Sequence, residues 1–263
     1  MQSNIDFRTS QSYLLGFGQT AAPAAGGTLN AQAARNLVLG RFNISPNLPV
    51  GQIDGTVTAL SVQGASILCS NQPCALRGFH TALQMDENFI GVPLVQNGVA
   101  SFTFAAQTVA SLVSAAIYAD PWNSLGEPPS PDESGPSSLN YAYGMGAQAL
   151  GAPAGSTITL QATALRACVL GRLYIGAINN AAVPPNHDSE AGVIVTSIQI
   201  NSTEQLGSAV GAGVPLSAFG LDALSSMANL NQFVPMNGTV SITIVNNSGV
   251  ALGVSSHFFC NAS

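Results

Sequence analysis

Short runs in which apolar and polar residues alternate recur along the whole chain. The segments SFTFA (101–105), TITLQAT (157–163) and SITIV (241–245) place Phe, Ile or Leu on one side and Thr, Ser or Gln on the other. A period of two puts the apolar side chains on one face of a half-buried β-strand. Thr and the β-branched residues suit a pleated strand, and Gly, Pro and Asn separate the runs. The pattern therefore predicts an all-β chain.

The C-terminal half contains enough of these runs for eight short strands. They are expected near residues 156–163, 168–176, 193–201, 204–208, 214–218, 233–236, 239–246 and 250–259. A short helix is expected after Phe79 and another after Phe219, because apolar residues are spaced three and four apart in TALQMDEN and LDALSSMAN. Eight strands without alternating helices predict a jelly-roll β-sandwich.

The motif VLGR occurs twice, at Val38–Arg41 and at Val169–Arg172. Each copy has a further arginine six residues before its own, Arg35 in the first and Arg166 in the second. Four of the six basic residues therefore belong to two copies of one pattern. A repeated motif of this kind indicates an internal sequence repeat, and such a repeat determines how the whole chain is divided into domains.

The match extends in both directions from this motif. YLLGFG corresponds to YAYGMG upstream, and NGVASFTF corresponds to NGTVSITI downstream. The separation between matched residues is 128 at Tyr13, 131 at Val38, 138 at Val57 and 140 from Leu76 to Tyr118, which answers Phe258. A separation that only grows, in few steps, indicates one ancestral unit that was duplicated and then lengthened by loops in its second copy.

Two tandem eight-stranded jelly-roll domains are therefore expected, over residues 1–120 and 141–263. Residues 121–140 are rich in proline and serine and carry an acidic cluster, so we expect an exposed linker there. The main insertion in the second copy is the proline-rich loop 179–192.

Composition narrows the function classes. The chain is 46% hydrophobic and only 7% charged, against roughly a quarter charged in ordinary soluble domains. The net charge is −6 and lysine is absent, which argues against binding nucleic acid through its phosphates. No run approaches the roughly 20 apolar residues of a membrane span, and the N-terminus shows no secretion signal. So neutral a surface favours burial against other subunits.

The order of these segments resembles a known family. PAGSTITLQATALRACVLGRLYI is followed by VTSIQINSTEQL, VPLSAFG and GTVSITIVNNSG, as in the jelly-roll unit of coat proteins of tailless phages. Two such units resemble the double jelly-roll major capsid proteins of icosahedral phages with internal membranes, the corticovirus- and tectivirus-like groups. The resemblance covers residues 13–120 and 141–263. The chain departs from that family in being short and in lacking a basic or transmembrane N-terminal anchor.

The resemblance implies a structural protein of the virion, made in the host cytoplasm, whose homotrimers are pseudo-hexagonal capsomers of an icosahedral shell. Three chains with two similar domains give six near-equivalent edges, which suits a lattice. The implied partners are neighbouring capsomers, penton and minor capsid proteins and an underlying membrane, with no direct nucleic-acid binding. The alternative is a tandem β-sandwich binding module, such as a phage fibre, a lectin or an adhesin.

No catalytic constellation is found in the sequence. The three histidines, His80, His187 and His257, form no HExxH motif, and no GxSxG nucleophile elbow is present. We therefore expect neither an enzyme nor a cofactor. Asn186–Glu190 concentrates oxygen ligands, so this loop is either an ordinary polar loop or a weak calcium site.

The four cysteines leave two alternatives open. Cys69 and Cys74 flank a short proline-containing turn that a disulfide could close. A zinc site would need two more ligands, and Cys168 and Cys260 belong to the other copy. These two are expected to be buried free thiols, close together only if the second and last strands of that copy are neighbours.

The repeated arginines also have two interpretations. Arg35, Arg41, Arg166 and Arg172 are expected at strand ends, where a guanidinium can bind loop carbonyls or carboxylates. The alternative is that they bridge capsomers or contact lipid phosphates.

Overall fold

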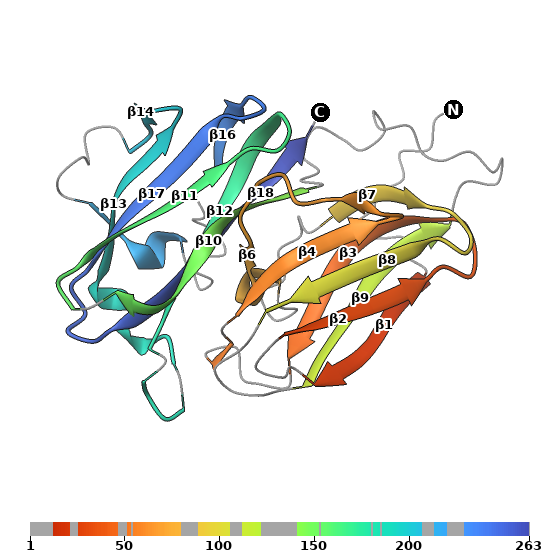
Figure 1. Ribbon diagram of the computed structural model, residues 1–263, viewed down its shortest axis with the longest axis horizontal. Helices are drawn as coiled ribbons and strands as arrows, with labels where there is room; N and C mark the ends of the chain where they lie inside the picture. Colours follow the sequence, from red (N-terminus) through yellow and green to blue (C-terminus); the bar gives the residue numbers. More distant parts are fainter. Residues whose placement is uncertain are drawn as a thin grey trace.

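The chain folds into two β-sandwiches placed side by side (Figure 1). The computed structural model describes residues 13–21, 26–46, 52–53, 55–79, 89–105, 112–121, 141–152, 154–179, 181–184, 186–206, 213–219 and 229–262. We refer to residues 13–121 as unit 1 and to residues 141–262 as unit 2. Within the described ranges the regular structure consists of strands and short 3-10 helices.

Unit 1 contains the first nine strands. They are β1 (Tyr13–Ala21), β2 (Gly27–Gln32), β3 (Leu37–Pro46), β4 (Thr56–Val62), β5 (Ala65–Ser66), β6 (Cys74–Ala75), β7 (Phe89–Leu94), β8 (Val99–Phe104) and β9 (Leu112–Pro121). One sheet has the order β1-β9-β3-β7 and the other the order β2-β8-β4-β5, with β6 also paired to β4. A 3-10 helix, η2 (Leu76–Phe79), follows β6.

Unit 2 repeats this arrangement with the second nine strands. They are β10 (Tyr141–Ala152), β11 (Thr157–Thr163), β12 (Cys168–Ile178), β13 (Val193–Ile200), β14 (Thr203–Glu204), β15 (Val214–Pro215), β16 (Asn229–Val234), β17 (Thr239–Asn246) and β18 (Leu252–Ala262). The sheets have the orders β10-β18-β12-β16 and β11-β17-β13-β14, with β15 also paired to β13. The 3-10 helices are η5 (Asp188–Gly192) and η7 (Leu216–Phe219).

This strand order is that of a jelly roll. In each unit the chain passes back and forth between two facing antiparallel sheets, and the first and last strands pair with each other. The predicted all-β fold of two jelly rolls is confirmed. The eight main strands of each unit are accompanied by one extra two-residue strand, β5 or β14.

The burial of the strands follows the alternation in the sequence. In β17, Val240, Ile242 and Ile244 are buried, whereas Ser241 and Thr243 are half-buried. β11 likewise buries every second residue. The buried side chains of β17 and β11 belong to the hydrophobic core of unit 2, and those of β2, β4 and β8 belong to the core of unit 1.

The two units also share their tightest turn. Asn97 and Asn237 both have φ of 66°, in the left-handed region that Asn tolerates better than most residues. In both copies the turn is closed by a backbone hydrogen bond, from Gly98 N to Val95 O and from Gly238 N to Pro235 O, each 2.8 Å long. The equivalent turns support a common origin of the two units.

Several sequence predictions need correction. β10 was missed, because its glycine- and alanine-rich sequence does not alternate. Residues 216–218, expected to continue a strand, belong to the 3-10 helix η7, since the strand ends at Pro215. The helices expected over TALQMDEN and LDALSSMAN lie outside the described residues. So does the predicted linker 121–140, apart from Pro121 at the end of β9.

The matched residues of the last strand are also shifted by one position. Leu39 pairs with Ala119 in unit 1, and its equivalent Leu170 pairs with Cys260 in unit 2. Ala119 therefore answers Cys260, and the separation is 141 rather than 140. By this register Ile117 answers the buried Phe258. The difference is important because a shift of one residue moves a side chain to the other face of the sheet.

Candidate functional site

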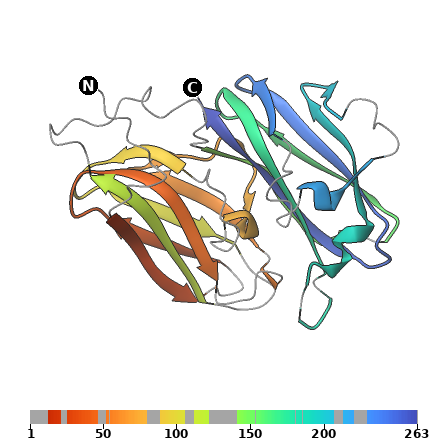
Figure 2. The same ribbon diagram turned by 180° about the vertical axis from the view of Figure 1, so that it is seen from behind.

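The most elaborate site in the molecule is the boundary between the two units. A segment of unit 1, residues 66–73, leaves the edge of its own sheet and lies along unit 2; we call it the strap. Figure 2 shows the same two sandwiches from behind, with the strands β10, β18 and β12 of unit 2 facing unit 1. Three groups of contacts hold the units together there.

The first group is backbone hydrogen bonding from the strap. Cys69 N donates to Ala142 O at 2.8 Å, and Leu165 N donates to Cys69 O at 2.7 Å. Asn71 N donates to Thr163 O at 3.1 Å, and the Ser70 hydroxyl donates to Gly144 O at 2.6 Å. The strap therefore joins unit 2 through isolated β-bridges, Leu68 with Ala142 and Ser70 with Ala164, and main-chain groups of unit 2 obtain hydrogen-bond partners from unit 1.

The second group is aromatic. Phe79 of η2 stacks on His257 of β18, with 4.9 Å between ring centroids and 9° between planes. Phe79 also meets Phe259 edge to face at 5.6 Å, and on its other side it meets Phe42 of unit 1 at 6.1 Å. Tyr174 and Phe259 belong to the hydrophobic cluster of unit 1 although their strands are in unit 2. The core of unit 1 is thus continuous across the boundary.

The third group is polar and largely buried. Arg77 Nη1 of η2 lies 3.3 Å from Glu190 Oε1 of η5. The same carboxylate oxygen is 2.8 Å from His187 Nδ1 and accepts a hydrogen bond from Ala177 N at 3.0 Å. The Arg77 and Glu190 side chains are 11% and 17% exposed, so water screens this ion pair weakly. His187 Nε2 lies 3.3 Å from Ile53 O, which adds another contact between the units.

His257 is a fully buried, neutral histidine at the centre of the boundary. Neither ring nitrogen has a hydrogen-bond partner among the described residues. Burial lowers the pKa of His257 to about 3 and raises the pKa of the neighbouring Tyr174 to about 12. Both side chains therefore hold their uncharged forms at neutral pH, as an apolar interface requires.

Three of the four cysteines meet at the same boundary. Cys69 of the strap, Cys168 of β12 and Cys260 of β18 lie in the core of unit 2, where each thiol shifts the pKa of its neighbours. Cys74 lies in the core of unit 1 instead. All four are free thiols, so Cys69 and Cys74 are not paired in the structure. The turn between them leads from one core to the other, which separates the two thiols. Cys168 and Cys260 were expected to lie close together only if their two strands are neighbours, and β12 and β18 do pair.

Two of the four repeated arginines are not at strand ends as expected: Arg41 lies within β3, and the half-buried Arg172 lies within β12. Arg35 is exposed and Arg166 is half-buried. Arg166 Nη2 donates to Ser66 O of the strap at 2.9 Å, a contact between the units. Bridging of capsomers by these arginines stays a prediction. Arg77, whose ion pair with Glu190 is largely buried, was missed by the sequence reasoning. The sequence did contain a signal for it: Arg77 is a charged residue at a position where the second copy has the small Ser217.

The loop Asn186–Glu190, considered for calcium, uses its oxygens within the protein. Asn186 Oδ1 accepts from Asp188 N at 3.3 Å, and Glu190 binds Arg77, His187 and Ala177 as described. Among the described residues no group of three or more His, Cys, Asp or Glu side chains is placed to hold a metal ion. Calcium binding stays a prediction.

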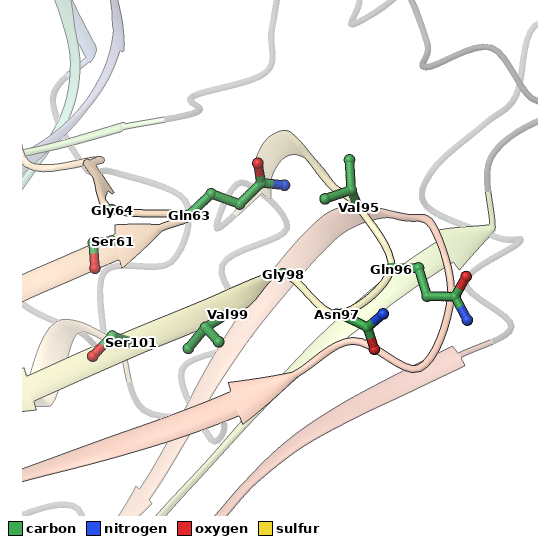
Figure 3. Close-up of a pocket in the computed structure, with 9 residues that line it drawn as sticks. All are labelled: Ser61, Gln63, Gly64, Val95, Gln96, Asn97, Gly98, Val99 and Ser101. Atoms are coloured by element: carbon green, nitrogen blue, oxygen red, sulfur yellow. The ribbon is translucent and has the colours of Figure 1, made fainter.

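A shallow depression of about 570 Å³ lies at one end of unit 1 (Figure 3). It is formed by the ends of β4 and β8 and by the turn between β7 and β8, with Gln63, Val95 and Val99 around it. Its lining residues are Ser61, Gln63, Gly64, Val95, Gln96, Asn97, Gly98, Val99 and Ser101. None of these side chains titrates near neutral pH, so this depression offers no general acid or base.

In the described part of the chain, no helix has the length and apolar character needed to cross a membrane.

Comparisons with known proteins leave the family open. No protein-family model matches the chain, and no curated protein matches it. Among solved structures, a chain from the atomic structure of Sulfolobus Turreted Icosahedral Virus is similar, with a TM-score of 0.41 and 10% identity. The match covers 95% of this chain and 89% of that chain. The strand order and register establish the jelly-roll architecture independently of this similarity.

Proposed function

We propose that the protein is the major capsid protein of an icosahedral virus and that three copies form a pseudo-hexagonal capsomer. The observation that carries this proposal is the head-to-tail contact between two structurally equivalent units. It is supported by the duplicated jelly roll and by a surface with few charges.

The contact between the units joins two different surfaces. Unit 1 contributes η2 and the strap, whereas unit 2 contributes the outer face of its β10-β18-β12-β16 sheet, including His257. Because unit 2 also has a 3-10 helix, η7, and unit 1 also has a four-stranded sheet with an outer face, one surface of each kind is left over in the chain: η7 of unit 2 and the outer face of the β1-β9-β3-β7 sheet of unit 1. A heterologous contact between equivalent units either closes into a ring or continues as a filament.

The leftover surfaces are more exposed than their equivalents within the chain. Arg77 and Gly78 of η2 are buried, whereas their counterparts in η7 are the exposed Ser217 and the half-buried Ala218. On the sheet face, Ala116 is half-buried, whereas its equivalent by register, His257, is fully buried. In this proposal η7 docks on the β9 face of the next copy in the arrangement that η2 has on β18, although the side chains differ, and three chains give a ring of six units.

The composition agrees with such an assembly. Interface centres are depleted in charged residues, and this chain is only 7% charged. The net charge of −6 without lysine gives little means of neutralising phosphates, so we place contacts to the genome in another component. In this proposal the protein is located in the virion. Its partners are neighbouring capsomers, penton proteins and an underlying membrane.

The test is the mass of the full-length protein in solution, measured by light scattering after size exclusion. We expect three times 26.7 kDa for the natural chain. Ala116→Arg, on the leftover sheet face, is expected to give folded monomers. Thr28→Arg is the matched control, since Thr28 is exposed on the opposite sheet of unit 1. Ser217→Arg tests the other half of the contact.

A monomeric natural protein at micromolar concentration would contradict the capsomer. So would a trimer that tolerates both Ala116→Arg and Ser217→Arg. Electron micrographs of concentrated protein would then separate a capsid protein, which forms closed shells or sheets of capsomers, from a tandem β-sandwich binding module, which forms neither.

A further inference from the structure

Three thiols meet where the strap of unit 1 crosses unit 2, although they are far apart in the sequence. Cys69 lies in the strap, Cys168 begins β12 and Cys260 lies near the end of β18. All three are buried, with exposed fractions of 1% or less. The trimer proposal uses none of them.

The strand register limits which thiols can bond covalently. Cys168 pairs with Ala262, so Cys260 is its diagonal neighbour on the same face of the sheet. Diagonal neighbours lie roughly 7–8 Å apart, beyond the usual reach of a disulfide. Cys69 is on a separate segment, the strap, and lies in the same core cluster as these two cysteines. Its carbonyl accepts a hydrogen bond from Leu165 N at 2.7 Å, three residues before Cys168.

The three thiols differ in acidity in the docked structure. The neighbouring thiols of Cys260 and Cys69, together with the charge of Arg166, lower the pKa of Cys168. The neighbouring Cys168 raises the pKa of Cys69, and burial raises the pKa of Cys260. The thiolate, which is the form that attacks a disulfide, is therefore favoured at Cys168.

We propose that Cys69 and Cys168 are a redox pair that forms a disulfide between the two jelly rolls. The oxidant is a low-molecular-weight disulfide of the glutathione type. Before the strap docks, the Cys168 thiol gives its proton to solvent and its sulfur attacks one sulfur of this disulfide, which releases one thiolate that takes up a proton and leaves a mixed disulfide on Cys168. As the strap docks, the Cys69 thiol gives up its proton in the same way, and its sulfur attacks the Cys168 sulfur of the mixed disulfide and releases the second thiolate, which is protonated in turn. Two protein thiols are oxidised and one external disulfide is reduced to two thiols.

The bond goes beyond the proposed function, because it concerns the inside of one chain rather than contacts between chains. It closes a loop of about 100 residues, and long loops gain most from a cross-link in the chain-entropy account. The consequence is a subunit whose two halves are held together by the strap alone under reducing conditions and by a covalent bond under oxidising ones.

The experiment is to refold the full chain in a buffer of reduced and oxidised glutathione, alkylate it without reduction, and identify linked peptides by mass spectrometry. We expect a peptide pair containing Cys69 and Cys168, which disappears on reduction. The urea midpoint of the oxidised protein is expected to be higher than that of the reduced protein. Cys69→Ala and Cys168→Ala should abolish this difference, whereas Cys74→Ala, the buried cysteine in the other core, should retain it.

A link from Cys69 to Cys74 or to Cys260, or a link between Cys168 and Cys260, would overturn the proposed pair. Four thiols that remain fully alkylated after oxidative refolding and denaturation would overturn it as well. Peptide mapping of the natural chain decides the matter even where a variant fails to fold, and it does not depend on the oligomeric state.

Discussion

Phe79 of unit 1 lies flat on His257 of unit 2, with 4.9 Å between the ring centroids. The residue before Phe79 is Gly78, and a Cβ placed there would overlap the imidazole of His257 and lie 3.1 Å from Tyr174 Cδ1. The two units therefore approach each other closely enough that the main chain of η2 contacts the histidine ring directly. A stack of this kind depends on both a neutral histidine and the absence of a side chain at residue 78.

The close approach predicts that Gly78→Ala weakens the contact between the units. The added methyl group must displace the His257 ring, which is held on other sides by Phe79 and Phe259. We expect a loss of about 1–3 kcal/mol in the free energy of unfolding, the usual cost of overpacking, measured by urea denaturation. Ala218→Gly, at the equivalent position of unit 2, is the control and should cost no more than about 1 kcal/mol. Equal effects of the two substitutions would contradict the proposed crowding.

The buried His257 predicts a dependence of stability on pH. Its pKa is about 3 in the folded protein and about 6.5 when unfolded, so the unfolded chain binds more protons between these values. Stability is therefore full above pH 6.5 and is lost as the pH falls toward 3, at up to about 1.4 kcal/mol per pH unit from this residue. The loss should be smaller in His257→Leu. We would compare the two proteins by urea denaturation at pH 7, 6, 5 and 4, since carboxylates contribute equally to both. Parallel curves would show that His257 does not stay neutral in the fold.

The ion pair between Arg77 and Glu190 predicts coupling between the units. Removing one partner leaves the other charge poorly solvated, so Arg77→Met alone should cost about 3 kcal/mol. The double variant Arg77→Met, Glu190→Gln should cost less than the sum of the single variants. A double-mutant cycle of unfolding free energies measures this coupling. Additive losses would indicate that the two side chains do not interact in solution.

The predicted linker over residues 121–140 can be tested by limited proteolysis of the unassembled protein. We expect the first cut there, giving two fragments of similar size on a denaturing gel. The fragments should still elute together under native conditions, because the strap and the aromatic contacts do not require an intact linker. A first cut inside unit 1 or unit 2 would contradict the boundary, and prompt separation of the fragments would contradict the strength of the contact.

The alternation of side chains predicted the strands best where one face is buried and the other exposed. β17 was expected at residues 239–246 and is found at Thr239–Asn246, because its pattern of β-branched and hydroxyl side chains suits only one register. β10 escaped notice because its Gly and Ala residues show no contrast between faces. The one-residue error in the last strand arose for a related reason: matching Leu112 with Leu252 ignores which face each residue occupies, and only strand pairing reveals it.

The contact between the units was much harder to predict. Cys69 looked like a partner for Cys74 because the two are close in the chain, but the strap carries Cys69 into the other core. Comparing the two copies reveals the residues that the units share. The contact between the units depends instead on residues that differ between the copies, so the comparison does not reveal it. Arg77, Gly78 and His257, which lie at the boundary, correspond to Ser217, Ala218 and Ala116 in the other copy.

The strap has a consequence for the order of events during synthesis. The N-terminal half leaves the ribosome first, so residues 66–73 are available before β10 and β12 exist. Ala142 O, Thr163 O and Leu165 N of the later half bond to this strap, which covers the edge that they form. Because Tyr174 and Phe259 also complete the core of unit 1, we expect the two halves to finish folding together. A circular permutant that is translated in the opposite order would have to fold its second half with this edge uncovered.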